Sequence, residues 1–205
     1  MTIGVLPSQT LLSMIDQGQI TGTAPLVPSQ IQPASLDLRL GHRAYRVRAS
    51  FLAGQNRSVL DRLSDFQMHQ IDLTNGAVLE KGCVYLVPLQ ESLALPDDIH
   101  GAANAKSSTG RLDLLTRTIT DGGVEFDRIP AGYHGPLYAE ICPRSFSVLV
   151  RPGMTLNQLR LRNGAAQLDD AALRDVHRQT PLVDHPPLIQ DGLGFSVDLE
   201  PRQNG

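Results

Sequence analysis

Residues 105–111 concentrate side chains that bind phosphate groups. The segment holds two cations, three hydroxyl groups and a run of backbone N–H donors within seven residues. If it opens a helix, these donors and the guanidinium fork of Arg111 can hold a polyphosphate. The other cation, Lys106, is one of only two lysines in the chain. The alternative interpretation is a polar loop in which a hydroxyl group caps a helix.

Glu140 lies inside an apolar, strand-like run at residues 135–142. Carboxylates are seldom buried unless they are paired or used in chemistry. Desolvation raises the pKa of a carboxyl group, and such a group can serve as a base near neutral pH. The alternative interpretation is that Glu140 simply occupies the outward face of a strand, with Tyr138 beside it.

A third polar segment, residues 121–128, combines two adjacent glycines with three acidic side chains. It is either a turn that lets the backbone approach a ligand or the end of a hairpin. The sequence does not decide between these two interpretations.

The chain lacks the motifs of zinc deamination. A zinc nucleobase deaminase needs a His-x-Glu motif and a Pro-Cys-x-x-Cys motif, and neither occurs. The six histidines form no closely spaced ligand pair, so we expect no transition-metal site. The phosphate-binding Gly-x-x-x-x-Gly-Lys motif and the dinucleotide-binding Gly-x-Gly-x-x-Gly motif are absent as well.

The composition argues against a nucleic-acid polymer or a membrane as partner. The net charge is -3, and four tyrosines and five phenylalanines are the only aromatic residues. No basic segment followed by an apolar run begins the chain, and no apolar stretch is long enough to span a membrane. We therefore expect a soluble, cytoplasmic protein in which Cys83 and Cys142 are buried, reduced thiols.

Short strands separated by glycine and proline turns predict a mainly β fold, either a sandwich, a jelly roll or a barrel. Helices are predicted at residues 8–17, 57–66 and 169–178, the first capped by Ser8 and ended by Gly18. A half-buried strand begins at Ser35, and a second follows through Tyr45 and Val47. Further strands are predicted near residues 77–80, 83–88, 92–95, 99–104, 117–120, 136–142, 146–150 and 156–162.

The 205 residues predict one large or two small domains. We assign residues 1–165 to a β domain and residues 166–205 to a helix plus connector, with a linker at 180–187. Residues 194–199 alternate like a strand and echo residues 34–38. This echo is either chance or the opening of a second, related unit.

Four segments together resemble the dCTP deaminase family over about residues 8–163. They are residues 31–41, 105–112, 132–140 and 151–159, in the order and approximate spacing of that family. The resemblance implies a distorted β-barrel or jelly roll of the dUTPase-like type, with a few short helices. It also implies active sites between subunits, in a homo-oligomer that is a trimer or a pseudo-hexameric arrangement.

The implied reaction is the hydrolytic deamination of dCTP to dUTP and ammonia, which supplies dUTP for thymidylate synthesis and uses no zinc. Glu140 matches the glutamate that activates water for attack on carbon 4 of cytosine and then passes protons onward. Ser107 and Arg111 match residues close to the reacting base and its water. Lys106 and Ser108 match residues that hold phosphates, with Mg²⁺ carried by the triphosphate.

Three further residues are candidates for nucleotide binding. Backbone groups near Thr120 are expected to read the cytosine edge. Asp127 and Gln158 complete the predicted binding set, which contains no metal ligand.

The chain departs from the family pattern in four places. Lys106 stands where the family usually has arginine, which keeps the charge but loses the bidentate fork. The loop between Thr120 and Arg128 is longer than usual, and Pro130 replaces an aspartate for which Asp121 or Asp127 could substitute. The segment that closes over the nucleotide has no match after residue 163. The chain is then a fragment, takes its lid from elsewhere, or has an incomplete site.

Two other functions remain open at this point. A dUTPase-like pyrophosphatase would use a water held by Asp121 or Asp127 at the phosphates. A non-catalytic nucleotide-binding or assembly domain would need no base at all.

Overall fold

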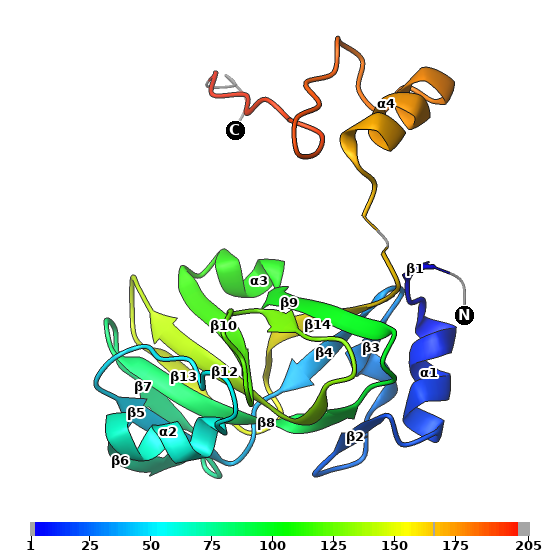
Figure 1. The fold of residues 1–205 in the computed structure, drawn as a ribbon. Helices are drawn as coiled ribbons and strands as arrows, with labels where there is room; N and C mark the ends of the chain where they lie inside the picture. Colours follow the sequence, from blue (N-terminus) through cyan, green and yellow to red (C-terminus); the bar gives the residue numbers. More distant parts are fainter. Residues whose placement is uncertain (1–2, 166, 201–205) are drawn as a thin grey trace. The chain divides into compact units, whose positions relative to one another are not determined.

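Short apolar runs between glycine and proline turns fold into antiparallel strands, as Figure 1 shows. The computed structural model describes residues 3–165 and 167–200. The chain divides into two compact units, Met1–Gly164 and Ala165–Gly205, and every predicted site residue belongs to the first. The prediction of a mainly β, distorted barrel with a few short helices is confirmed.

The first sheet contains the strand that leads into the 105–111 segment. Its strands are, in spatial order, β11 (Arg128–Ile129), β9 (Ile99–Ala105), β14 (Thr155–Asn163), β4 (Ser35–Arg39) and β3 (Ile31–Gln32). A short strand near the start of the chain, β1 (Gly4–Val5), also pairs with β14. All of these pairings are antiparallel.

The second sheet contains Glu140. Its strands are, in spatial order, β10 (Leu114–Thr120), β12 (His134–Pro143), β8 (Val84–Ala94), β5 (Arg43–Val47) and β6 (Gln67–Asp72). The short β2 (Ile20–Gly22) pairs with β8, and β7 (Ala77–Leu79) pairs with β13 (Val148–Val150) as a separate ribbon. A bridge between Leu40 and Leu89 links the two large sheets at one corner.

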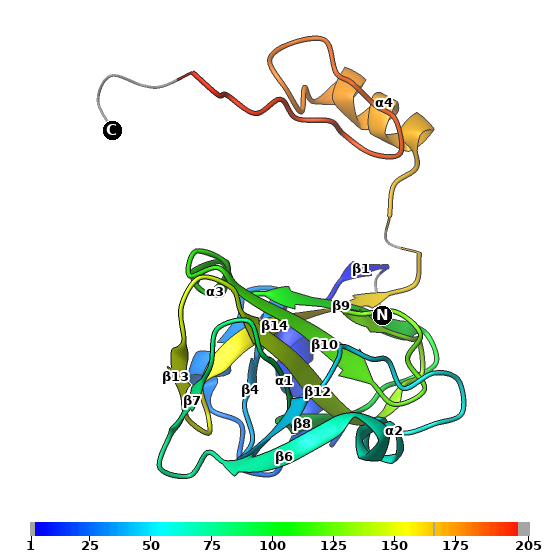
Figure 2. The same ribbon diagram turned by 90° about the vertical axis from the view of Figure 1, so that its left-hand side faces the viewer.

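Two apolar clusters hold the first unit together. The larger lies between the sheets, where Leu36 and Leu159 of the first sheet join Val87 and Ala139 of the second. The smaller covers the opposite face of the second sheet, where α2 (Val59–Phe66) packs on it (Figure 2). Its buried members are Val47, Phe51, Ala53, Val59, Leu63, Leu86, Ile119 and Tyr138. Both faces of the central strands are therefore removed from water.

Three helical segments of this unit have recognisable boundaries. The first helix, α1 (Ser8–Asp16), ends before Gly18 at a φ of +73°, as predicted. The predicted cap is wrong, because Pro7 occupies the cap position and no side chain accepts a hydrogen bond there. A 3₁₀ turn, η1 (Pro28–Gln30), precedes β3. In α2 the hydroxyl of Ser58 accepts from the Asp61 N–H at 3.0 Å.

The structure corrects several strand boundaries. The runs predicted near 83–88 and 92–95 form one strand, β8, because polar residues between them remain buried and paired. The strand β6 was not predicted, since most of its side chains are exposed and show no apolar alternation. The strand β4 is buried along its whole length rather than half-buried, because its polar residues Asp37 and Arg39 have ionic partners.

The cysteines match the prediction only in part. Both thiols are free, and Cys142 is buried as expected. Cys83 is only half-buried, because it follows a turn and lies just before the start of β8 rather than within the strand.

Within its described residues the second unit has one helix, α4 (Asp170–Gln179), close to the predicted bounds. The Asp169 carboxylate caps it by accepting from the Ala172 N–H at 2.8 Å. Residues 180–187 form no helix or strand, as expected of a linker. The strand predicted at 194–199 is wrong, since the described residues offer it no partner and Phe195 is 75% exposed.

Candidate active site

A polar pocket of about 250 Å³ lies where the 105–111 segment meets the first sheet. Its lining comes from β3 and β4, from the start of α3 (Ser107–Gly110) and from β14. The lining residues are Gln32, Ser35, Asp37, Lys106, Ser107, Ser108 and Gln158. The structure thus brings together four of the predicted binding residues.

The helix α3 is a single turn that leaves the hydroxyl groups of Ser107 and Ser108 exposed. The cap position is Lys106, and no side chain caps the helix, so the hydroxyl-cap interpretation is wrong. Ser107 and Ser108 are exposed at the pocket, whereas the Thr109 hydroxyl is buried and donates to the Leu156 carbonyl at 3.0 Å. Arg111 follows the helix and is exposed.

Lys106 reaches into the pocket and forms an ion pair with Asp37. Its ammonium group also donates to the Thr155 hydroxyl at 3.0 Å. The carboxylate is almost fully buried, and its Oδ1 has no hydrogen-bond partner among the described residues. The pair fixes the lysine side chain at the pocket wall, where three-donor ammonium groups bind anions as point charges.

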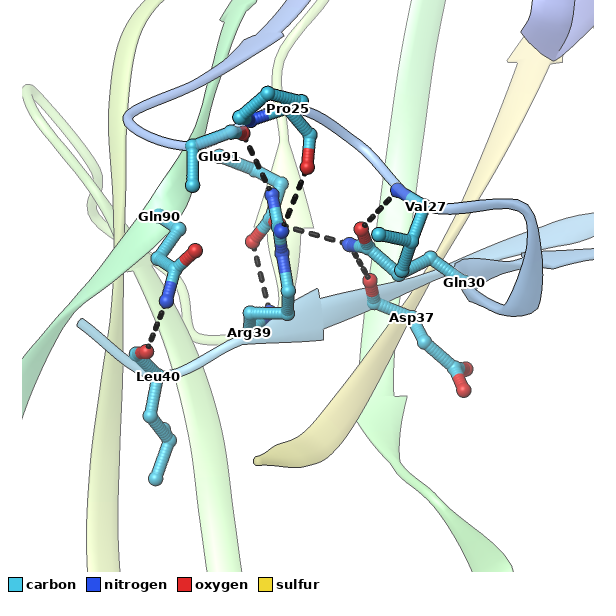
Figure 3. Close-up of polar contacts among 9 residues, drawn as sticks. Pro25, Val27, Gln30, Asp37, Arg39, Leu40, Gln90 and Glu91 are labelled. Atoms are coloured by element: carbon cyan, nitrogen blue, oxygen red, sulfur yellow. Dashed lines mark hydrogen bonds and ion pairs between the residues drawn. The ribbon is translucent and has the colours of Figure 1, made fainter. Parts of the chain in front are cut away.

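A buried polar network holds the backbone of β4 around Asp37 (Figure 3). The Gln30 amide donates to the Asp37 carbonyl and to the Glu91 carboxylate, both at 2.9 Å. Glu91 is fully buried and accepts from the Arg39 backbone N–H and from its Nε, each at 2.8 Å. The remaining guanidinium nitrogens donate to carbonyls of residues 24 and 25. The guanidinium nitrogens of Arg39 and the side-chain amide of Gln30 therefore all have acceptors, as buried polar and charged groups require.

Glu140 occupies the middle of β12, and its side chain is 4% exposed. In the sheet it lies opposite Arg117 on one side and Leu86 on the other. It shares a strand face with Tyr138, as one interpretation expected, but α2 and residues 48–58 cover that face. The outward face of the strand is therefore a buried environment.

Arg117 is the charged partner of Glu140. Its Nε and Nη2 donate to Oε1 of the carboxylate at 3.1 Å and 2.5 Å. The Nη2 group also donates to the Ser50 hydroxyl at 2.9 Å, and the guanidinium lies 3.7 Å from the centroid of the Phe126 ring. The hydrogen bonds and the ring contact hold the guanidinium beside the carboxylate.

Thr120 is the last residue of β10, and Asp127 lies in the following loop, close to the same strand. Thr120 is buried, and it borders a second pocket of about 280 Å³ formed largely by the 121–130 loop. Its Oγ1 has no hydrogen-bond partner within the described ranges. The Asp127 carboxylate accepts from the Thr118 N–H at 2.7 Å. Burial raises the pKa of Asp127, and the Thr118 N–H and the Arg117 charge oppose that rise.

The predicted residues thus fall into two groups in one chain. Lys106, Ser107, Ser108 and Gln158 share the first pocket, and Arg111 lies just after its helix. Glu140, Thr120 and Asp127 belong to the second sheet and its adjoining loop. No hydrogen bond or ion pair joins Glu140 to the first group in the part of the chain that is described.

Sequence reasoning missed Asp37 and Arg117 as partners of the candidate residues. Asp37 lies 69 positions from Lys106, and Arg117 lies 23 positions from Glu140. The available signals were a charged residue inside each of two strand-like runs. They did not reveal which residues face each other across the sheets.

The described ranges contain no group of three or more metal-ligating side chains. None of the helices in residues 3–165 and 167–200 is long and apolar enough to cross a membrane.

Comparisons with known proteins point to one family. Residues 2–165 match the family model of the 2'-deoxycytidine 5'-triphosphate deaminase N-terminal domain. A dCTP deaminase of Haloarcula marismortui is 29% identical over 158 residues, which cover 76% of this chain and 78% of the relative. A relative from Corynebacterium kroppenstedtii, named as a dUMP-forming dCTP deaminase, is 30% identical over 166 residues, covering 77% and 80%.

The fold is also that of a solved dCTP deaminase. The crystal structure of the Agrobacterium tumefaciens protein superimposes with a TM-score of 0.86 at 51% sequence identity. The match covers 92% of this chain but only 57% of the crystallised one.

Proposed function

Because the chain belongs to the family of 2'-deoxycytidine 5'-triphosphate deaminase N-terminal domains, we propose that it deaminates dCTP to dUTP and ammonia. The observation that carries this proposal is the buried Glu140 carboxylate, which Arg117 binds through one oxygen only. A carboxylate held in this way has its second oxygen available for a water molecule. The names of the relatives support the same reaction.

In the proposed mechanism Glu140 acts first as a base and then as an acid. It takes a proton from water while the resulting hydroxide bonds to carbon 4 of the cytosine ring. The carboxyl group then returns that proton to ring nitrogen 3. Glu140 next takes the proton of the new hydroxyl group on carbon 4 and passes it to the amino group. The carbon–nitrogen bond breaks, ammonia leaves, and a carbonyl forms at carbon 4. One carboxyl group that alternates between two protonation states can perform both tasks.

The phosphate groups belong in the first pocket. We assign their binding to Lys106 and Ser108, with Gln158 on the neighbouring strand. Magnesium enters as part of the substrate, since it keeps phosphate and water ligands rather than demanding a protein cage. The nucleobase is assigned to the region between Glu140 and Thr120, where polar backbone groups can read its edge.

Ser107 and Arg111 are assigned to the reacting base on the family resemblance. They lie in the group that makes no hydrogen bond or ion pair with Glu140 within the described residues. We therefore propose that one copy supplies Ser107 and Arg111 to the Glu140 of another copy, as a trimer or pseudo-hexameric arrangement would allow.

The direct test is to incubate the protein with dCTP and Mg²⁺ and to measure ammonia. Glu140→Gln preserves the shape of the side chain but removes the base, so kcat should fall by at least about 100-fold. Glu80→Gln is the matched control, because Glu80 also pairs with an arginine but is largely exposed. Full turnover by Glu140→Gln would exclude the proposed base.

Shared sites have their own test. Glu140→Gln and Arg111→Ala should each be inactive alone. After the two variants are mixed under conditions that exchange subunits, some sites would combine both intact residues, and activity should return. No recovery in exchanged oligomers would contradict the shared site.

A second candidate activity follows from the relatives named as dUMP-forming. In that case the chain would also release pyrophosphate. The carboxylates of Asp121 and Asp127 accept from the backbone N–H groups of Val59 and Thr118, both at 2.7 Å. Neither carboxylate lines the Lys106 pocket, so they are weak candidates for a phosphate-side water. Pyrophosphate measured beside ammonia separates the two activities, and release of neither favours a binding or assembly domain.

A further inference from the structure

We propose that Arg117 is the residue that positions Glu140 for catalysis, and that Phe126 from the 121–128 loop holds Arg117 in place. The inference rests on the proposed function, because it gives Glu140 a catalytic task. Its structural basis is one arginine that contacts three separate segments. Those segments are β12 through Glu140, residues 48–58 through Ser50 and the loop through Phe126.

The hydrogen bonds determine which oxygen of Glu140 is free. Both donors of Arg117 meet Oε1, and no donor in residues 3–165 or 167–200 meets Oε2. Two charge-assisted hydrogen bonds to one oxygen hold that oxygen against the guanidinium and leave the other oxygen without a donor from Arg117. Oε2 is then directed away from Arg117 and can accept a proton from water.

Arg117 is itself held firmly. The Ser50 hydroxyl accepts from Nη2, and the guanidinium lies over the face of the Phe126 ring. Electrostatic attraction to an aromatic face is strongest when part of the cation is shielded from water, and Arg117 is about 30% exposed. The arginine is thus clamped between a carboxylate and a ring.

The loop that supplies Phe126 also forms the second pocket. Residues 122–125 line that pocket together with Thr120. A hydrogen bond from the Gly54 N–H to the Gly123 carbonyl, at 3.0 Å, ties the loop to the segment that contains Ser50. The loop that forms this pocket therefore also brings a ring over Arg117.

The experiment compares ammonia release from dCTP by the wild type, Arg117→Met and Arg117→Lys. We expect Arg117→Met to lower kcat by up to about 100-fold, the cost of a small misplacement of a reacting group. KM should change by less than about threefold. Arg117→Lys restores the charge and should recover part of kcat.

Phe126→Leu removes the ring while keeping both charges, and it should shift kcat in the same direction by a smaller factor. If Arg117→Met fails to fold, the kcat of Phe126→Leu tests the positioning role instead, and an unchanged kcat would overturn it. The control is Arg62→Met, because Arg62 also lies over a ring, that of Phe66 at 5.3 Å, and pairs with Asp65 on α2. That variant should leave kcat unchanged.

The outcomes separate the two proposals. A wild type that releases no ammonia overturns the proposed function, and the positioning role with it. An active wild type whose kcat is unchanged in folded Arg117→Met overturns the positioning role alone. Equal losses in Arg62→Met and Arg117→Met would show a structural effect and would also overturn it.

Discussion

Two ion pairs in the first unit resemble each other in burial but differ in which partner, the cation or the carboxylate, is the candidate functional group. In the Lys106–Asp37 pair the side chains are 26% and 6% exposed, and in the Arg117–Glu140 pair they are 30% and 4% exposed. Each pair thus joins a half-buried cation to a buried carboxylate. In the first the cation faces a pocket, whereas in the second the carboxylate is the candidate catalytic group.

The difference lies in what surrounds each pair. The Lys106 pocket is lined by hydroxyl and amide groups, and behind it the Glu91 network holds β4. The Glu140 site is covered by α2 and the 48–58 segment, and a ring packs on its arginine. A polar, open pocket suits a solvated polyanion, and a covered carboxylate suits proton transfer. The proposed function accordingly assigns phosphate binding to Lys106 and proton transfer to Glu140.

The largest expected effect comes from breaking the support behind the first pair. Glu91→Gln leaves the buried guanidinium of Arg39 without its carboxylate, which should lower the free energy of unfolding by about 3–5 kcal/mol. Urea denaturation measures this loss. Glu140→Gln provides the comparison, since Arg117 remains partly solvated and should tolerate the change better. Equal losses in the two variants would contradict the expectation that the buried Arg39–Glu91 pair contributes more to stability than the partly solvated Arg117–Glu140 pair.

The next effect sharpens the role of Lys106. Lys106→Met should raise the KM for dCTP by about tenfold, equivalent to about 1.4 kcal/mol of binding, while kcat changes less. Lys106→Arg should retain binding, since it keeps the charge and adds a fork that matches phosphate. Steady-state kinetics at several salt concentrations measures both. A fall in kcat without a rise in KM would place Lys106 in the chemistry instead.

A smaller effect concerns the loop beside Glu140. The Tyr133 hydroxyl donates to the Pro136 carbonyl at 2.5 Å and accepts from the Asp121 N–H at 3.1 Å. Burial raises the pKa of Tyr133 to about 12. Tyr133→Phe should cost about 1 kcal/mol of stability. Thermal unfolding at neutral pH measures that cost, and an unchanged melting temperature would show that the loop does not depend on this anchor.

The smallest effect is a pH dependence at Asp127. Burial raises the pKa of this carboxyl group, so ionisation of Asp127 opposes folding. The contribution of Asp127 to the free energy of unfolding therefore falls as the pH rises from near 3.8 through the raised pKa. Asp127→Asn should therefore gain stability relative to the wild type across that interval. Denaturation at a series of acidic pH values measures the gain. If the stability of Asp127→Asn relative to the wild type instead falls as the pH rises, the charge of Arg117 outweighs burial in its effect on the Asp127 carboxylate.

The sequence predicted the local parts of this molecule better than its pairings. Residues 105–111 carry their signal within seven positions, and all of α3 lies inside that segment. Glu140 was identifiable because a carboxylate interrupts an apolar run. Arg117 was not, since only the register between β10 and β12 sets it opposite Glu140. Asp37 was missed for the same reason, because contacts between distant strands leave no periodic trace in one sequence.

The pairing of β1 with β14 bears on how the chain is made. Gly4 and Val5 pair with Asn163 and Arg162, so the first strand finds its partner only at the far end of the unit. Contacts between such distant segments slow folding because a long loop must close first. During synthesis the ribosome must therefore release nearly the whole unit before the first sheet is complete. Until then the early strands present unpaired edges, which are the kind that chaperones protect from aggregation.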